Sequence, residues 1–400
     1  MTTALSPART AGPAPMPTAA PGPGGPSLAS ARPDPADLDP RRALRELARW
    51  RADGRDAARF PYRAVLGHYR AVGKNAVAAE LLTALRAVEP AVPAPAEPAR
   101  AAARLLRDWL PQVVDGARGD YDSYLGTPVY ASLARAGAEA RTDVVITALL
   151  ADLVAIEAAT LAAAPAGRAR TRAALRALTA ATGLVSGGPG PAPQLADDDP
   201  AELVRACAEA VTAARQAVPS SVLHAVELTL TPTTRCHDEQ MFIRVIQIFE
   251  AVFAAVARSI AAATEAVAEG RGERARELLA DATRQVAGTS GVFRVLTTMP
   301  KDAFAVIRAN TDGRSAVQST SYRTVEQTAP ELYRTLLRSP VEEGELSSVM
   351  RELDEAWGAM KRTHWGITMK VIGQVRGTGG TAGASYLREA AEARLFPALA

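Results

Sequence analysis

Apolar residues recur at the spacing of an α-helix along almost the whole chain from Arg41 onward. In the first such segment, Leu44, Leu47 and Ala48 fall three and four residues apart, so they share one face of a helix. Runs in which apolar and polar residues alternate, as in a half-buried strand, are scarce, and no repeat of fixed period is present. This patterning predicts a mostly α fold.

Several segments carry the helical pattern strongly enough to be predicted as individual helices. Residues 223–230 (LHAVELTL) fit either a strand or a short helix. Pro111 is expected to end the helix predicted over residues 101–110. The predicted helices are residues 77–88, 101–110, 144–164, 168–181, 201–218, 238–269, 272–286 and 347–373.

Proline and glycine divide the chain into parts. Residues 1–40 hold ten of the 28 prolines, no aromatic residue and no apolar run, which predicts a disordered tail without a signal peptide. Residues 183–200 (GLVSGGPGPAPQLADDDP) combine glycine, proline and acidic residues, as expected of a linker between domains. The prediction is therefore a smaller N-terminal helical domain, residues 41–182, and a large C-terminal helical domain, residues 201–400.

Charge and cysteine content exclude several classes of protein. Arg and Lys number 46 against 43 Asp and Glu, and the net charge of +3 gives no reason to expect a nucleic-acid surface. Two cysteines, Cys207 and Cys236, are too few for a disulfide framework and fit a reducing compartment. The most apolar run, residues 144–164, contains Asp152 and Glu157, so a buried helix is favoured over a membrane span. We therefore expect a cytoplasmic protein.

Common catalytic motifs are absent from the sequence. It contains no HExxH, no GxxxxGK[ST], no GxSxG and no GxGxxG after a strand. The four histidines are scattered singly, so a multi-histidine metal site would need distant residues to converge. Cys236 and His237 are sequence neighbours whose side chains diverge, which disfavours a Cys/His nucleophile pair.

His364 is the histidine with the most informative surroundings. It shares one face of a predicted helix with four residues at helical spacing: Trp357, Met360, Thr368 and Val371. A lone histidine on such a face is commonly a core residue, but residues 377–383 (GTGGTAG) follow it closely. Their backbone N–H groups and threonine hydroxyls can wrap around a polar ligand. A flexible tail and a phosphate-binding loop are the alternatives, although the phosphate loop lacks its lysine and preceding strand.

Three segments of the C-terminal half combine into a recognisable pattern. Residues 237–250 are HDEQMFIRVIQIFE, residues 304–308 and 315–323 are FAVIR and SAVQSTSYR, and residues 364–388 begin HWGITMKVIG and continue into GTGGTAGASYLR. In order and spacing they resemble the distal helix, the substrate-carboxylate segment, and the proximal-histidine helix with GTGG loop of the tryptophan/indoleamine 2,3-dioxygenase superfamily. The layout with a smaller N-terminal helical domain is also similar to indoleamine 2,3-dioxygenase and the tryptophan-rearranging enzyme of pyrrolnitrin biosynthesis.

The resemblance implies a cofactor and residues that bind substrate. It implies a helical domain that binds haem b non-covalently, with His364 as the proximal ligand of the iron. Arg308 would pair with the carboxylate of the substrate, for which a guanidinium fork is well suited. Thr378, with Gly379 beside it in the glycine-rich loop, would bind the ammonium or carboxylate end of the substrate.

The resemblance also implies the surroundings of the reacting atoms. Ser315 and Ala316 would lie over the distal face of the haem, near bound oxygen. The candidates for an apolar wall around an aromatic ring are Phe242, Phe249, Phe253 and Phe304, although a phenylalanine of the distal helix is more commonly plain core.

The chain departs from the family at a few positions. Where tryptophan 2,3-dioxygenases have a distal histidine, this chain has Ile246, and where some of them have a tyrosine, it has Phe304. The segment that resembles the distal helix therefore offers no side chain that could act as a base. His237 aligns with the HDE signature, and we interpret it, together with Asp238, as helix capping. Thr368 stands where related peroxide-using hydroxylases can have a cysteine, so no covalent haem link is expected.

The function implied is a haem b-dependent oxygenase of specialised metabolism. It would insert oxygen from O2 at the indole C2=C3 bond of tryptophan or a modified tryptophan. Its expected partners are an indole amino acid and O2, without nucleic acid or membrane, and it would be a monomer or homo-oligomer. Two alternatives remain: a peroxide-dependent aromatic hydroxylase or rearranging enzyme on the same scaffold, and a non-catalytic haem-binding or haem-sensing protein.

Overall fold

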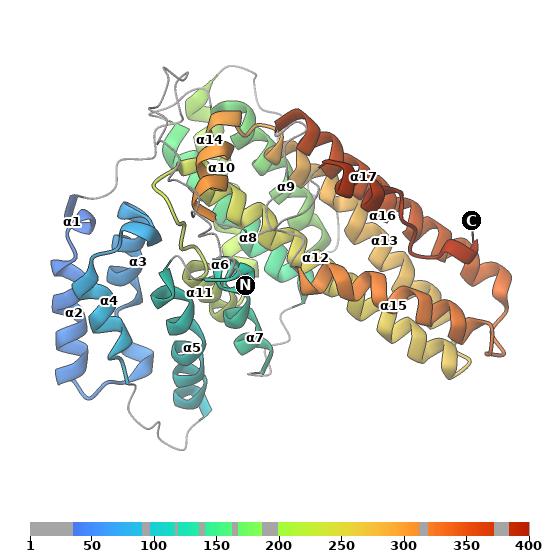
Figure 1. Cartoon of the computed structure of the whole chain (residues 1–400), viewed down its shortest axis with the longest axis horizontal. Helices are drawn as coiled ribbons and strands as arrows, with labels where there is room; N and C mark the ends of the chain where they lie inside the picture. The colour runs from blue at the N-terminus through green and yellow to red at the C-terminus, as the bar shows by residue number, and fades with distance from the viewer. Residues whose placement is uncertain are drawn as a thin grey trace, which may run out of the picture.

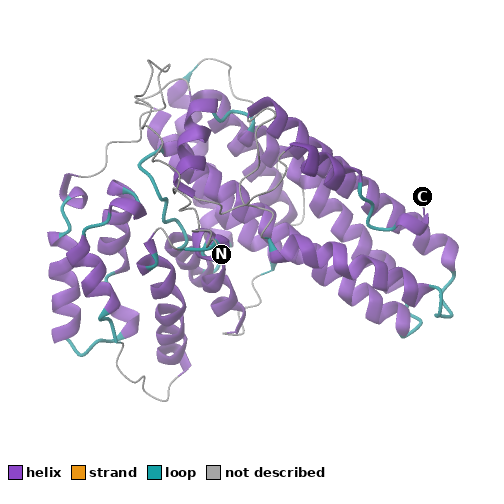
Figure 2. Cartoon of the chain, viewed as in Figure 1, coloured by secondary structure: helices purple, strands orange, loops and turns teal. Residues whose placement is uncertain are grey.

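The computed structural model describes residues 35–89, 97–116, 119–135, 141–161, 167–185, 199–311, 319–371 and 384–399. Every regular element in these ranges is a helix (Figure 2), which confirms the mostly α fold. In chain order the α-helices are α1 (Pro35–Leu38), α2 (Arg41–Ala52), α3 (Tyr62–Val72), α4 (Ala79–Arg86), α5 (Glu97–Val114), α6 (Tyr121–Leu125), α7 (Thr127–Arg135), α8 (Thr142–Leu161), α9 (Arg168–Val185), α10 (Pro200–Ala217), α11 (Ser220–Leu228), α12 (His237–Ala268), α13 (Gly272–Leu296), α14 (Lys301–Thr311), α15 (Thr320–Leu336), α16 (Glu343–Val371) and α17 (Ala384–Glu392).

Four long helices, α12, α13, α15 and α16, form a bundle on the right of Figure 1. α12 packs against α13 and α15, α13 packs against α16, and α17 lies along α16. The chain reverses between α12 and α13 at Gly270, whose φ of +74° lies in the left-handed region that glycine adopts without strain. Buried apolar faces of these helices form the main hydrophobic core.

The main core extends beyond the bundle into α8, α9 and α10. Leu149 of α8, Leu178 of α9 and Leu203 of α10 are buried in the same cluster as the apolar residues of α12 and α13. The first three residues of the predicted linker, 183–200, belong to α9 and its last residue begins α10, while residues 186–198 lie outside the described ranges. The division into domains 41–182 and 201–400 stays a prediction, with α8 and α9 packed against the C-terminal helices.

Two helices, α8 and α12, are long and apolar enough by length and composition to cross a membrane. In α8, Asp152 pairs with Arg244 of α12 at 2.6 Å, and Glu157 lies 3.6 Å from Arg170 of α9. Both acidic side chains therefore have a cation as partner inside the fold, and α8 is the buried helix predicted over residues 144–164.

The N-terminal helices α2 to α5 surround a second core of aromatic side chains. Phe60 and Tyr62 contact Trp109 edge to face, with 5.7 and 5.0 Å between ring centroids, and Trp50 contacts Phe60. The indole N–H of Trp109 donates a hydrogen bond to the carbonyl of Leu228 in α11, at 3.0 Å. This contact joins the aromatic core to the rest of the molecule.

Local structure at Pro111, at residues 223–230 and at residues 35–40 can be compared with the sequence prediction. Pro111 lies inside α5, where the burial of Trp109 and Val113 on either side holds the helix together despite the lost backbone hydrogen bond. Residues 223–228 belong to a helix, α11, which agrees with the short-helix alternative for residues 223–230. Residues 35–40 belong to the folded chain, because α1 packs on α3 and the carbonyl of Asp37 lies 2.9 Å from a ring nitrogen of His68; residues 1–34 are outside the described ranges.

Candidate functional site

The start of α12 is fixed by a carboxylate that reaches back along the chain. Glu239 accepts hydrogen bonds from the backbone N–H and hydroxyl groups of both Thr233 and Thr234, at 2.6 to 2.8 Å. The hydroxyl of Tyr124 donates to the same carboxylate at 3.2 Å. Glu239 thus ties the incoming loop to the first turn of the helix.

His237 and Asp238 do not cap α12 as the sequence suggested. Asp238 accepts a hydrogen bond from Arg170 at 2.5 Å, and Nε2 of His237 lies 3.3 Å from Oε1 of Glu157. All four side chains are buried. The capping interpretation was wrong for these two residues, because a buried arginine from α9 and a carboxylate from α8 face them.

His364 lies on α16, among aromatic side chains. Its ring centroid is 6.5 Å from that of Phe293 on α13, and Trp357 lies two turns earlier on the same helix. Desolvation by these surroundings lowers the pKa of His364, which favours the neutral imidazole, the form that binds metals. The backbone carbonyl of His364 accepts a hydrogen bond from the hydroxyl of Thr368, at 3.0 Å.

His364 is isolated from other metal-binding side chains. The described part of the chain contains no group of three or more His, Cys, Asp or Glu residues that could hold a metal ion. A single neutral imidazole suits a metal whose remaining ligands come from a porphyrin, since the protein then supplies one axial donor. His364 is a side chain that could provide such a donor.

Residues 237–250, the segment that resembles the family's distal helix, lie at the start of α12. Phe242 and Ile246 are only partly buried, although most residues around them in α12 are fully buried. Phe242 contacts Phe304 of α14 edge to face, with 5.8 Å between centroids. Two of the predicted wall residues are thus brought together, and no basic side chain stands at Ile246.

Arg308 lies one helical turn after Phe304 on α14, and both side chains are partly buried. Residues four apart share a face, so Arg308 is on the side of α14 that Phe304 turns toward α12. Four of the predicted residues, Ser315, Ala316, Thr378 and Gly379, lie outside the described residues.

A chain of ring contacts connects the distal helix with His364. Phe249 and Phe253 of α12 are 6.0 Å apart, and Phe249 lies 4.7 Å from Phe293, which in turn contacts His364. Of the predicted wall residues, Phe249 therefore belongs to the buried core, whereas Phe242, Phe253 and Phe304 are partly buried and pack against it.

Sequence reasoning missed Glu250, one turn beyond Ile246 on α12. Its carboxylate accepts a hydrogen bond from the hydroxyl of Tyr121 at 2.8 Å and is also bonded to Ser319 and Ser321. Burial raises the pKa of this carboxyl above its ordinary value. The spacing of Phe242, Ile246 and Glu250, four residues apart, was the signal that could have placed this acid on the distal face.

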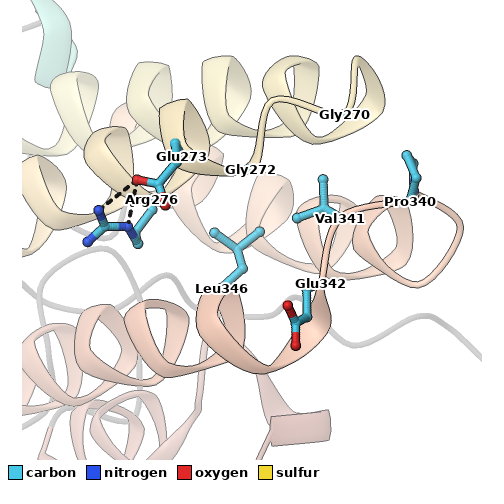
Figure 3. Close-up of a pocket in the computed structure, with 8 residues that line it drawn as sticks. All are labelled: Gly270, Gly272, Glu273, Arg276, Pro340, Val341, Glu342 and Leu346. Atoms are coloured by element: carbon cyan, nitrogen blue, oxygen red, sulfur yellow. Dashed lines mark hydrogen bonds and ion pairs between the residues drawn. The ribbon is translucent and has the colours of Figure 1, made fainter.

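A hollow of about 260 Å³ lies at the opposite end of the bundle (Figure 3). It is bordered by the α12–α13 and α15–α16 connections, with the ion pair of Glu273 and Arg276 at one side and Leu346 at its floor. Leu346 and His364 are eighteen residues apart on α16, about 27 Å along a helix axis. The hollow is therefore separate from the candidate site.

Comparison with known proteins supports the superfamily suggested by the three segments. No family model matches the chain. The chain is similar to a tryptophan 2,3-dioxygenase. That relative, from Bradyrhizobium diazoefficiens, is 26% identical over 235 residues, which cover 42% of this chain and 84% of the relative. The similarity to the pyrrolnitrin-pathway enzyme stays a prediction.

Proposed function

We propose that the protein is a haem b-dependent oxygenase that acts on tryptophan or a modified tryptophan. The observation that carries this proposal is His364 on α16, whose ring lies beside that of Phe293 and whose pKa is lowered by desolvation. The similarity to a tryptophan 2,3-dioxygenase supports the reaction class and the substrate class. The proposed setting is the cytoplasm, in a specialised pathway.

The haem would be held non-covalently between α16 and the distal helix α12. When bound it would supply the oxygen-activating chemistry. His364 would provide the axial nitrogen, and the apolar side chains of Phe242, Ile246 and Phe304 would exclude water from the reacting face. Thr368, one turn after His364, donates its hydroxyl to the backbone carbonyl of His364 at 3.0 Å and offers no thiol for a covalent link.

The substrate would be positioned through its amino-acid end. Arg308 would pair with the carboxylate, and Thr378 with Gly379 would bind the ammonium or carboxylate from the glycine-rich loop. Ser315 and Ala316 would border the indole near the oxygen. Orientation of the C2=C3 bond by these contacts would contribute most of what the protein itself adds to the rate.

Ile246 makes a second outcome worth testing. An isoleucine can neither accept the indole N–H nor transfer a proton, so the protein offers no base on that helix position. A substituted indole, a rearrangement, or a hydroxylation driven by peroxide would be compatible with this apolar distal face. These outcomes share the scaffold and differ in the oxygen atoms found in the product.

The cofactor assignment is tested by comparing His364→Ala with His224→Ala, a matched change at a partly exposed histidine of α11. We expect the wild type and His224→Ala to bind one haem with a histidine-type Soret band, and His364→Ala to lose that band. An unchanged spectrum in His364→Ala would contradict the ligand assignment.

The reaction is tested by mass spectrometry of products formed from ¹⁸O-labelled O2 with a panel of tryptophans. Two labelled oxygens indicate dioxygenation, one indicates monooxygenation, and none indicates rearrangement or a peroxide-driven reaction. A haem-binding protein without catalysis would give no product with any of them, and in that case the oxygenase assignment fails.

A further inference from the structure

We propose that Tyr322 and Trp357 form a one-electron relay that carries oxidising equivalents from the haem site to the surface of the bundle. This proposal rests on the proposed function, since it needs a haem at His364. It concerns a part of the bundle that neither the substrate contacts nor the distal face uses.

The aromatic rings of Tyr322 and Trp357 are stacked against each other. Tyr322 at the start of α15 and Trp357 of α16 stack with 5.3 Å between centroids and 23° between ring planes. Phe253 of α12 contacts both rings edge to face, with 5.5 Å between its ring centroid and that of Tyr322 and 5.3 Å to that of Trp357. Trp357 is fully buried, and Tyr322 is partly exposed. The pair therefore leads from the interior toward solvent.

The inner end of the pair lies near the proposed haem ligand. Trp357 and His364 are seven residues apart on α16, which is two helical turns and about 10 Å along the axis. Both residues fall on the same face of the helix. An electron that leaves Trp357 thus has a short path to a haem bound at His364.

The outer end of the pair has a proton acceptor. The hydroxyl of Tyr322 donates a hydrogen bond to Oε1 of Glu326 at 2.7 Å, and the ammonium group of Lys361 lies 3.8 Å from the same oxygen. The side chain of Glu326 is 36% exposed, so a proton received there can pass to water. The indole N–H of Trp357, by contrast, is buried without a hydrogen-bond partner among the described residues.

These contacts determine which of the two side chains would hold a stable radical. Trp357 can lose an electron but has no described acceptor for its proton, so it would be a transient carrier. Tyr322 would lose one electron to Trp357 and its phenolic proton to Glu326, which leaves a neutral tyrosyl radical. The oxidant is hydrogen peroxide, whose O–O bond breaks as it takes up two electrons, with any protons that its oxygens need coming from water. Tyr322 would supply one electron through Trp357 and the haem the other, which would leave the haem oxidised by one electron.

The test uses full-length, haem-loaded protein mixed with hydrogen peroxide and frozen rapidly for electron paramagnetic resonance. The wild type should show a tyrosyl radical whose spectrum narrows when the protein carries ring-deuterated tyrosine. Tyr322→Phe keeps the ring stack but removes the hydroxyl, and it should lose this signal. Tyr333→Phe, the same change further along α15, is the control and should retain it.

A second variant tests the route through the tryptophan. Trp357→Phe should slow the appearance of the tyrosyl signal, while haem content measured on the same sample shows whether the site is intact. A wild type that binds haem but forms no tyrosyl radical, or a Tyr322→Phe variant with an unchanged signal, would overturn the relay alone. Failure of the wild type to bind haem would overturn the proposed function as well.

Discussion

The carboxylate of Asp354 accepts a hydrogen bond from the backbone N–H of Leu395, at 2.6 Å, inside the protein. Seven residues later on α16, the ammonium group of Lys361 donates to the carbonyl of Ala393 at 2.5 Å. With Leu395 and Phe396 buried beside them, these contacts anchor the end of the chain on the helix that carries His364.

Replacement of Asp354 should loosen this anchor. Asp354→Ala leaves the buried N–H of Leu395 without its acceptor, and we expect a loss of about 1–3 kcal/mol in the free energy of unfolding. Urea unfolding followed by circular dichroism measures the loss. Glu355→Ala, the exposed neighbour on α16, is the control and should change stability by at most about 0.5 kcal/mol. Equal effects of the two changes would show that the anchor contributes little.

Replacement of Arg170, which pairs with Asp238, should lower the free energy of unfolding further. Both side chains are buried and lie 2.5 Å apart, so Arg170→Met leaves the carboxylates of Asp238 and Glu157 without their cation. We expect a loss of about 3–5 kcal/mol, measured by thermal or chemical unfolding. Arg205→Met, at an exposed pair on α10, is the matched control, for which about 0–1 kcal/mol is expected. A loss no larger than that of the control would contradict the assignment of a buried ionic cluster.

Glu250 should make stability depend on pH. Burial raises the pKa of its carboxyl above the ordinary value of 4.5, so the folded protein holds this proton more tightly than the unfolded chain does. Its contribution to stability is therefore complete below about pH 4.5 and is lost as pH rises through the raised pKa.

The variant Glu250→Gln stays neutral at every pH and isolates this effect. Relative to it, the wild type should become progressively less stable as pH increases from about 4 to 7. Urea unfolding at a series of pH values gives the difference directly. Glu265→Gln, an exposed change on the same helix, should run parallel to the wild type. A parallel profile for Glu250→Gln as well would rule out the raised pKa.

Arg308 should act on substrate binding. Under the proposed function, Arg308→Ala removes the charge-assisted partner of the substrate carboxylate, worth about 1.5–3 kcal/mol, or roughly a tenfold to hundredfold higher KM. Titration of the Soret band with tryptophan provides a second readout of the same loss. Lys301→Ala, an exposed cation of the same helix, is the control. An unchanged KM in Arg308→Ala would remove this residue from the site.

Long, regular helices were predictable because their apolar periodicity is continuous. The predicted helix 238–269 agrees with α12 to within one residue at each end. The predicted helix 272–286 stopped short, because Gly288 and Gly291 weaken the local pattern. In α13 the helix continues to Leu296, since burial of Val292, Phe293 and Val295 outweighs the low helix propensity of two glycines.

The candidate residues were predicted from short segments of sequence. His364 was singled out by the glycine-rich segment that follows it, and Phe304 and Arg308 by the resemblance of residues 304–308 to a segment of the dioxygenase superfamily. The contacts of Glu250 with Tyr121 and Ser319 were not predictable, because these partners are remote along the chain, and neither was the pairing of Arg170 with Asp238. Tertiary packing, which the sequence does not display, creates these contacts.

The main core has a consequence for any break in the chain between residues 186 and 198. α8 and α9 precede this segment, yet their buried faces pack against α10, α12 and α13 beyond it. Two fragments separated there would each expose a large apolar face that only the other covers. We expect them to behave as a split protein: insoluble when produced alone, and restored by co-expression to a complex that migrates with the size of the intact chain.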